Sequence, residues 1–411
     1  MKDKTVAVIG SGVAGLTTAL ALTKFDVSVD IIEKADFAGG HAIRFACKAT
    51  SECVKCGACL VDEKLGQAMR ESKIKIRVGS RIEKISKTKK RYSIRLNQKP
   101  AFIDAQKCSV CGVCLQQCPQ DNAIVRGVSG NHVPFFAIDE KECLYLTEQS
   151  CSRCREACPE DAIALDAHAD QITCEADAVV LATGFSLFDP RHKPYGYGVF
   201  QNVMTNMELE GIMRRNGEIL KPSDGLPARK VAFIQCVGSR DAKLDHLWCS
   251  KICCGSALRM AGLINDRQPA SEICFFYIDT QTFGRDFELF YRRIQKEVRM
   301  IRAIPGDIFE TPEKQLRVYY TTHDTHESIE EIFDCVVLSV GLQPRKDNLD
   351  IFNELNLKGD GCNFIDPAEI EKASSGNGIF SAGAVGGPMS IAESVASAGE
   401  TVNKILNFLD V

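Results

Sequence analysis

Short apolar runs, a glycine-rich turn and an apolar-periodic segment succeed one another over the first forty residues. Residues 5–10 read Thr-Val-Ala-Val-Ile-Gly and predict a buried strand, and residues 27–32 predict a second one. Between them, the turn Ser-Gly-Val-Ala-Gly at residues 11–15 leads into a helix that we expect to reach about Phe25. This order predicts one βαβ unit of a nucleotide-binding α/β fold.

The pattern of buried strands repeats later in the chain. Residues 177–184, Asp-Ala-Val-Val-Leu-Ala-Thr-Gly, are nearly copied at 334–341, Asp-Cys-Val-Val-Leu-Ser-Val-Gly. Another buried strand is expected at 230–236, where a second lobe would open. Residues 378–388, followed by an alanine-rich helix, would return the chain to the first lobe. This internal similarity predicts two related α/β lobes.

Residues from about 100 to 165 interrupt this pattern. They are dense in cysteine, show little apolar periodicity and are broken by Pro119, Pro134 and Pro159. We therefore expect an inserted small metal-binding domain. The expected boundaries are a nucleotide-binding lobe at 1–99 with a cysteine-rich loop at 47–59, the insertion at 100–165, the first lobe again with a connection at 166–228, a second lobe at 229–345 and a final return to the first lobe at 346–411.

Composition and charge narrow the class of protein. The 411 residues are 45% apolar and 25% charged, which describes a globular chain with room for two or three domains. The 50 basic and 54 acidic residues give no broad positive field, so nucleic acid is not an expected partner. No export signal is recognisable, and no apolar run reaches the roughly 18 residues of a membrane span. We expect a cytoplasmic chain that meets a membrane only through partners.

Twenty cysteines stand out in this composition. Without an export signal, they are expected to be thiolates for metal or redox work in a reducing compartment, and not a disulfide framework. Sixteen fall into four tight groups: Cys47, Cys53, Cys56 and Cys59; Cys108, Cys111, Cys114 and Cys118; Cys143, Cys151, Cys154 and Cys158; and Cys236, Cys249, Cys253 and Cys254. The isolated ones, expected to be small buried apolar residues, are Cys174, Cys274, Cys335 and Cys362.

The glycine turn carries the first candidate site. Gly10-x-Gly12-x-x-Gly15 allows a tight turn, a close approach of backbone to pyrophosphate, and binding at a helix N-terminus. Glu33 ends the second strand and can accept the hydroxyls of a ribose. Later segments resemble those of flavoproteins with two dinucleotide domains, which favours FAD over NAD. The expected FAD-binding residues are Gly10, Gly12, Val13, Ala14, Gly15, Glu33, Lys34, Gly39, Gly40, His41, Ala182, Thr183, Gly184, Gly383 and Ala384.

The spacing Cys108-x2-Cys111-x2-Cys114-x3-Cys118-Pro119 is that of bacterial ferredoxins. In that pattern the first three thiolates bind one [4Fe-4S] cluster, and the fourth, before the proline, binds a second cluster.

The partner motif departs from this pattern. It reads Cys151-x2-Cys154-x3-Cys158-Pro159, with Glu148 where the first ligand is expected, and Cys143 is the natural substitute. We therefore assign one cluster to Cys108, Cys111, Cys114 and Cys158, and the other to Cys143, Cys151, Cys154 and Cys118. A pair of structural zinc sites is the alternative.

Two further cysteine groups are less regular. Cys47, Cys53, Cys56 and Cys59 offer four thiolates within thirteen residues, and Gly57 allows the chain to bend closely. Another [4Fe-4S] cluster, a zinc hook and ordinary thiols beside a flavin all fit this group. The group at residues 236–254 occupies the turn where a second lobe would hold a nicotinamide nucleotide. That turn reads Cys-Val-Gly-Ser-Arg-Asp, without the fingerprint Gly-x-Gly-x-x-Gly.

Three segments in this region resemble a known family. They are Lys-Pro-Ser-Asp-Gly at 221–225, Gln-Cys-Val-Gly-Ser-Arg-Asp at 235–241 and Trp-Cys-Ser-Lys-Ile-Cys-Cys at 248–254. They closely resemble the A subunit of heterodisulfide reductase and its relatives, among them the A subunit of the quinone-interacting membrane-bound oxidoreductase. The resemblance covers nearly the whole chain. It implies that Cys236, Cys249, Cys253 and Cys254 hold a [4Fe-4S] cluster close to the flavin.

The fold expected from these observations is α/β. It is a thioredoxin-reductase-like, two-lobed, FAD-binding Rossmann-type fold with an inserted ferredoxin-like two-cluster domain. Compared with the larger family members the chain resembles a short form, without their N-terminal cluster-binding extension and C-terminal ferredoxin domain.

Arginines are the candidate catalytic residues. Arg259 stands where the family commonly has a lysine near the flavin, and a permanently charged guanidinium cannot act as a tunable ammonium. Electron bifurcation or confurcation by the flavin is therefore left open. On the resemblance, Arg240 or Arg259 is expected to stabilise a reduced anionic flavin. For each, a surface or phosphate-pairing arginine is the alternative.

The expected function is electron transfer. A flavin exchanges electrons in pairs or singly and each cluster exchanges one, so FAD with three or four [4Fe-4S] clusters would link the two kinds of chemistry. We expect an oxidoreductase subunit of a larger complex, a homodimer within it, with partners similar to the B and C subunits of heterodisulfide reductase. One alternative is a stand-alone NAD(P)H-dependent thioredoxin-reductase-like flavoenzyme with Cys253 and Cys254 as redox pair. Another is a zinc-stapled, non-catalytic assembly scaffold.

Overall fold

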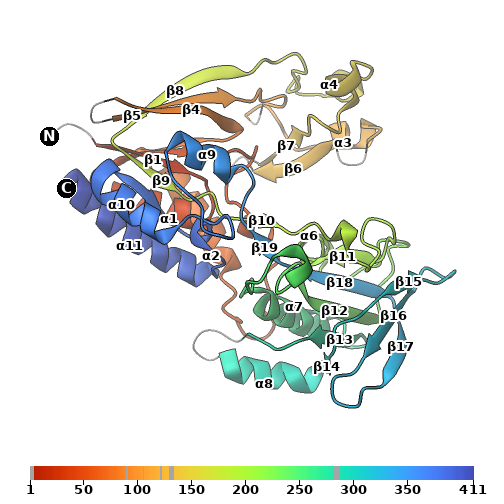
Figure 1. The fold of residues 1–411 in the computed structure, drawn as a ribbon. Coiled ribbons are helices and arrows are strands. Elements are labelled where there is room, and N and C mark those ends of the chain that lie inside the picture. The colour runs from red at the N-terminus through yellow and green to blue at the C-terminus, as the bar shows by residue number, and fades with distance from the viewer. Residues whose placement is uncertain (1–3, 89–90, 105, 121–122, 129–133, 282–286) are drawn as a thin grey trace.

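The first lobe is built on a five-stranded parallel sheet, as Figure 1 shows for the computed structural model. The structure describes residues 4–411 apart from 89–90, 105, 121–122, 129–133 and 282–286. In spatial order the strands of this sheet are β20 (Ile379–Ser381), β9 (Ala178–Leu181), β1 (Thr5–Ile9), β2 (Ser28–Ile32) and β3 (Ile74–Arg77). The predicted βαβ unit is thereby confirmed, with α1 (Val13–Thr23) between β1 and β2.

Different helices and strands pack on the two faces of this sheet. Helices α1, α2 (Ala58–Arg70) and α11 (Ile391–Leu409) pack on one face. On the other lie a three-stranded antiparallel sheet and the helices α9 (Asn348–Glu354) and α10 (Pro367–Asn377). The strands of the antiparallel sheet are β4 (Ser80–Thr88), β5 (Arg91–Gln98) and β8 (Asp170–Ala176). The short 3-10 helices η1 (Ala42–Arg44) and η4 (Ala384–Gly386) complete the lobe.

The second lobe repeats this plan. Its parallel sheet consists of β11 (Val203–Thr205), β18 (Cys335–Val340), β12 (Lys230–Val237), β13 (Glu272–Tyr277) and β14 (Arg299–Arg302). One face carries α6 (Asn206–Asn216), α7 (Cys253–Arg267) and α8 (Phe287–Glu297). The other face carries the antiparallel strands β15 (Ile308–Glu310), β16 (Leu316–Thr321) and β17 (Ser328–Phe333). The remaining 3-10 helices are η2 (Pro190–His192) and η3 (Ala242–Leu244).

The internal similarity in the sequence corresponds to this structural repeat. The two similar segments form β9 and β18, which pair in parallel with the middle strand of their own lobe's sheet, β1 and β12. Directly after them, β10 (Ser186–Leu187) and β19 (Leu342–Gln343) pair with each other where the chain crosses between lobes. The prediction of two related α/β lobes is confirmed.

The predicted insertion lies between β5 and β8 and has a small core of its own. Its elements are α3 (Val113–Gln117), β6 (Ile124–Val128), β7 (Pro134–Ile138), α4 (Leu144–Glu148) and α5 (Arg153–Glu156). Its two ends meet at an antiparallel bridge between Ile103 and Ile163. In Figure 1 this unit stands beside the first lobe and above the second.

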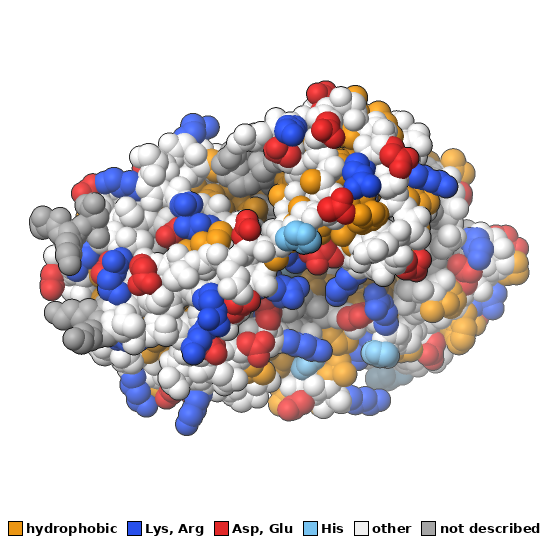
Figure 2. All heavy atoms as spheres, turned by 90° about the horizontal axis from the view of Figure 1, so that it is seen from above, with side chains coloured by type: hydrophobic (Ala, Val, Ile, Leu, Met, Phe, Trp, Pro, Cys, Tyr) orange, Lys and Arg blue, Asp and Glu red, His pale blue; other side chains and the backbone are white. Residues whose placement is uncertain are grey.

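On the face seen in Figure 2, Lys and Arg lie interspersed with Asp and Glu. Among the helices of the described residues, none has the length and apolar character needed to span a bilayer.

Three of the four isolated cysteines are core residues, as predicted. Cys174, Cys274 and Cys335 are buried in the described structure. The prediction was wrong for Cys362, which is partly exposed. It lies in a turn, where its N–H donates to Oδ1 of Asp360 at 2.8 Å.

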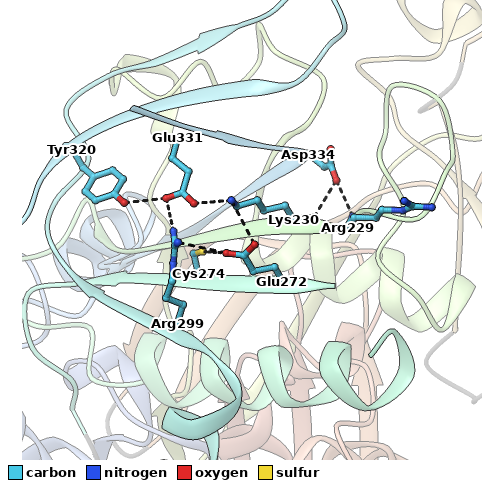
Figure 3. A network of polar contacts seen from close by, with 8 residues as sticks. All are labelled: Arg229, Lys230, Glu272, Cys274, Arg299, Tyr320, Glu331 and Asp334. Carbon is cyan, nitrogen blue, oxygen red and sulfur yellow. Dashed lines mark hydrogen bonds and ion pairs between the residues drawn. The ribbon is translucent and has the colours of Figure 1, made fainter. Parts of the chain in front are cut away.

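A charged network joins the two sheets of the second lobe at the first residues of β12, β13 and β14 (Figure 3). The Glu331 carboxylate from β17 is only 12% exposed and accepts hydrogen bonds from Lys230 Nζ at 2.7 Å, Tyr320 Oη at 2.9 Å and the Arg299 guanidinium. Cys274 and Glu272 lie close enough to share a metal ion with Glu331. Since the two cations already neutralise these carboxylates, we assign the network a structural role.

Glu331→Gln should lower the free energy of unfolding by about 2 kcal/mol at pH 7, because it removes charge-assisted hydrogen bonds at a largely buried site. Burial alone would raise the pKa of Glu331, but hydrogen bonds from Lys230 and Arg299 lower it overall from 4.5. Its stabilising contribution should therefore be complete above about pH 4.5 and fade as the pH falls through the lower folded-state pKa.

Urea denaturation of the full chain measures this difference. The matched control is Glu330→Gln, which removes an exposed ion pair with Arg317 and should cost less than about 0.5 kcal/mol. Equal losses in the two variants would contradict the structural role of the network.

Candidate functional site

A cavity of about 1390 Å³ lies between the lobes. The first lobe contributes the glycine turn and the segment from Glu33 to Gly57, and the second contributes residues of α7 and α8. Of the fifteen predicted FAD-binding residues, all but Gly15 and Gly383 line this cavity. The structure thus gathers at one site residues that are up to several hundred positions apart in the sequence.

The glycines of the turn play different structural roles. Gly10 has a φ of +109°, and a Cβ there would lie 2.3 Å from the Ala182 carbonyl oxygen. A Cβ at Gly15 would lie 2.0 Å from the Gly10 oxygen, and one at Gly383 would lie 2.6 Å from the Ala14 Cβ. Gly15 and Gly383 therefore allow the backbone to pack closely behind the cavity wall, which explains why they do not line it.

Gly12 has nothing within 4 Å of a Cβ position and is the N-cap of α1. No side chain caps this eleven-residue helix, and its first turn holds no acidic residue. Its N–H groups and helix dipole are therefore available to an anionic group such as a pyrophosphate.

Glu33 and His41 are fixed at the cavity wall. The Glu33 carboxylate accepts hydrogen bonds from Ser11 N at 2.9 Å, Ser11 Oγ at 2.6 Å and Ala35 N at 2.8 Å. Its expected contact with ribose hydroxyls stays a prediction. The His41 ring stacks on Phe185 with centroids 4.7 Å apart, and burial lowers its pKa, which favours the neutral imidazole.

The inserted domain brings the first predicted cysteine quartet together. Burial raises the pKa of the Cys114 thiol to about 11, and three neighbouring thiols contribute in the same direction. These neighbours are Cys108, Cys111 and Cys158. One of them, Cys158, comes from the second motif. We call this exchange of the last cysteine between the two motifs the crossed assignment.

The second quartet in this domain is arranged in the same way. Burial raises the pKa of the Cys154 thiol to about 11, with contributions from Cys143, Cys118 and Cys151. All four of these cysteines line one small cavity of about 20 Å³, together with apolar residues such as Ile124 and Ile138. Cys143 thus lies where the sequence assigned it as a substitute ligand.

The third quartet lies at the end of β12 and the start of α7. Burial raises the pKa of Cys253, with Cys254, Cys236 and Cys249 contributing. Cys236 has a φ of +60° beside an irregularity in the pairing of β12 with β18, so the strand bends at this ligand position. Residues 251, 252 and 255 line the large cavity, which places this quartet next to it.

The group from Cys47 to Cys59 differs from the other three. None of its four cysteines is buried. Cys53 and Cys56 line the large cavity, whereas Cys47 and Cys59 do not. A cluster held by all four stays a prediction.

The two candidate arginines are placed differently. Arg259 lines the cavity, where its Nε donates to the Val54 oxygen at 3.0 Å and its guanidinium lies 4.9 Å from the Phe287 ring centre. Burial lowers its pKa. Arg240 is not among the described residues that line the cavity; it pairs with Asp279 at 2.6 Å, beside the third quartet. The expected contact of Arg240 with a flavin is therefore unsupported, because the chain turns its side chain toward Asp279.

Sequence reasoning missed several charged residues of the cavity wall, and one of them is buried. Lys48 lines the cavity although its side chain is only 3% exposed. A lysine between cysteines in an irregular loop gives no periodic signal, and its burial depends on Glu210 in the distant helix α6.

Comparison with known proteins agrees with this picture. Residues 8–60 match a family model described as an NAD(P)-binding Rossmann-like domain. Over 96% of its length the chain is 30% identical to the A subunit of the H(2):CoB-CoM heterodisulfide,ferredoxin reductase of Methanothermobacter thermautotrophicus, and 32% identical to the iron-sulfur A subunit of the CoB--CoM heterodisulfide reductase of Methanocaldococcus jannaschii. It spans 62% and 63% of the length of these relatives.

Solved structures show the same fold at low sequence identity. Thioredoxin reductase of T. acidophilum is similar with a TM-score of 0.55 at 15% identity, and that of Lactococcus lactis with a TM-score of 0.54 at 14% identity. Each comparison covers 100% of both chains. The predicted thioredoxin-reductase-like, two-lobed α/β fold is confirmed.

The crossed assignment of cysteines predicts which ligands share a cluster. Cys108→Ser and Cys158→Ser should each lose about four irons per chain, and so should the double variant, because both serve one [4Fe-4S] cluster. The control pair, Cys108→Ser with Cys151→Ser, should lose about eight. Iron analysis of the purified full chain measures this. A loss of about eight irons in Cys108→Ser/Cys158→Ser would refute the crossed assignment.

Proposed function

The chain belongs to the family of heterodisulfide reductase A subunits, which it resembles over nearly its whole length, and we propose that it is an FAD and [4Fe-4S] electron-transfer subunit of an oxidoreductase complex. The observation that carries this proposal is the presence of three cysteine quartets in one chain with a dinucleotide-binding cavity, one of which lies beside that cavity.

FAD fits the cavity by the chemistry of its wall. Gly10 and Gly12 hold the backbone open at the N-terminus of α1, where a pyrophosphate would bind. Glu33 offers a carboxylate at the end of β2, the position at which Rossmann folds bind ribose. Bound FAD would supply the exchange of electrons in pairs or one at a time.

The spacing of the thiols favours iron-sulfur clusters over zinc. A single tetrahedral zinc ion, with Zn–S distances of about 2.3 Å, holds its four sulfurs only about 3.8 Å apart. Within the part of the chain that the structure describes, no three cysteine sulfurs lie within 4.8 Å of one another. A cube with iron at four corners holds its thiolates further apart than one ion does. The donor sets therefore fit [4Fe-4S] clusters.

Aromatic packing brings the inserted domain to the same cavity. Phe37 lines the cavity and packs on Phe135 in the core of the inserted domain, with ring centres 5.2 Å apart. The third quartet adjoins the cavity from the other lobe. We propose that the flavin exchanges electrons with clusters on both sides, so that the chain conducts electrons between partners.

The partners proposed are the other subunits of such a complex. Both relatives are named as subunits of reductases. Cys111 is exposed, so the first cluster of the inserted domain would have a corner within reach of a partner's redox centre. Partners similar to the B and C subunits of heterodisulfide reductase, a second copy of the chain within the complex, and a cytoplasmic location are all inferred from the resemblance.

A stand-alone NAD(P)H-dependent reductase is less well supported. Its redox pair would be Cys253 and Cys254, yet adjacent cysteines seldom form an unstrained disulfide. Both lie at the start of α7, close to the thiols of Cys236 and Cys249. NADH would bleach the flavin of such an enzyme in the isolated chain, whereas the flavin of the proposed electron-transfer chain should remain oxidised.

Cys253→Ala should lose about four irons per chain and keep its FAD, because the pyrophosphate site lies on the other lobe. The matched control is Cys335→Ala, a buried cysteine of the same lobe outside any quartet, which should keep all its iron. Iron and flavin are counted per chain after anaerobic purification. Unchanged iron in Cys253→Ala would exclude this residue as an essential ligand.

A further inference from the structure

A buried ion pair ties the wall of the cavity to helix α6. Lys48 Nζ lies 2.5 Å from Glu210 Oε1, and the two side chains are 3% and 2% exposed. The Glu210 carboxylate also accepts a hydrogen bond from Ala46 N at 2.8 Å, and Lys48 Nζ donates to the Ala46 oxygen at 3.3 Å. The ammonium lies 5.1 Å from the centre of the Phe45 ring. Both charges are thus fixed in place with their hydrogen bonds made.

The two members of the pair differ in their relation to the cavity. Lys48 and Phe45 line it, and Glu210 lies behind them on α6. Arg214, one turn further along α6, donates to the Ile43 oxygen and holds the same segment. The pair therefore presents its positive member to the cavity and keeps its negative member behind.

Other cations of the cavity wall are more exposed to water. The side chains of Lys34, Lys251 and Arg293 are 45%, 34% and 45% exposed, and each forms an ion pair with a carboxylate. Arg259 is partly buried but engages two carbonyl oxygens and the aromatic rings of α8. A charge shielded from water acts more strongly on its neighbours than an exposed one.

We propose that Lys48 stabilises the negative charge that the bound flavin gains on reduction, and that Glu210 limits the strength of this effect. The inference rests on the proposed binding of FAD in this cavity. Fixed charges aimed at the place where new charge develops stabilise it without reorganising when the electrons arrive.

Sulfite tests this proposal, because it adds to oxidised flavin and leaves the ring system negatively charged. Lys48→Met should weaken sulfite binding about tenfold, since it removes the positive charge and leaves Glu210 unbalanced. Glu210→Gln should strengthen it by a similar factor, since Lys48 then acts alone. The control Lys73→Gln removes an exposed lysine that pairs with Asp26 and should leave the affinity unchanged.

The opposite signs separate an effect of charge from structural damage, which would weaken binding in both variants. Breaking a buried pair can prevent folding, so Lys48→Met/Glu210→Met provides a second comparison, because apolar replacement of such a pair is commonly tolerated. It should bind sulfite more weakly than the wild type and more tightly than Lys48→Met.

The flavin absorbance of the wild type, recorded before sulfite is added, distinguishes a failure of the proposed function from a failure of the role proposed for Lys48. A chain without flavin contradicts the proposed function and this inference with it. Bound flavin with unchanged sulfite affinity in all variants, or with shifts of the same sign in both single variants, overturns the role of Lys48 and leaves the proposed function standing.

Discussion

The burial of closely spaced thiols is the constraint on which the rest of this structure depends. Burial raises the pKa of Cys114, Cys154 and Cys236 to about 11, and in each case neighbouring thiols push it in the same direction. Four thiolates held together in a low dielectric need a positive centre among them. The proposed iron-sulfur clusters would provide such centres.

The scaffold places one of the three quartets beside the cavity between the lobes. Two lobes of the same plan, linked by β10 and β19, enclose one cavity between them. In the second lobe, a cysteine quartet follows the first strand at the turn where a nicotinamide fingerprint would stand. The inserted domain reaches the cavity through the contact of Phe37 with Phe135. This arrangement is the basis of the proposed conduction of electrons between redox centres.

Local patterns made much of this predictable. The turn at Gly10 and the repeated strand at 334–341 carry their signals in consecutive residues. The crossed assignment of the cysteines, which rests on the Cys-Pro endings, stays a prediction. Features that depend on distant partners were not predictable. Lys48 is buried because it pairs with Glu210 of α6. Ala46, which lies two residues before Lys48 and also bonds to Glu210, is 164 residues away from that glutamate in the sequence. Arg240 forms an ion pair with Asp279, and no sequence motif indicates this pairing.

The most direct test of the account is a count of iron, zinc and flavin in the full chain purified without oxygen. Three quartets predict about twelve irons per chain, or about sixteen if the group from Cys47 to Cys59 binds a cluster as well, together with one FAD and almost no zinc. A colourless protein with about one zinc per quartet, or a flavoprotein without iron, would contradict it.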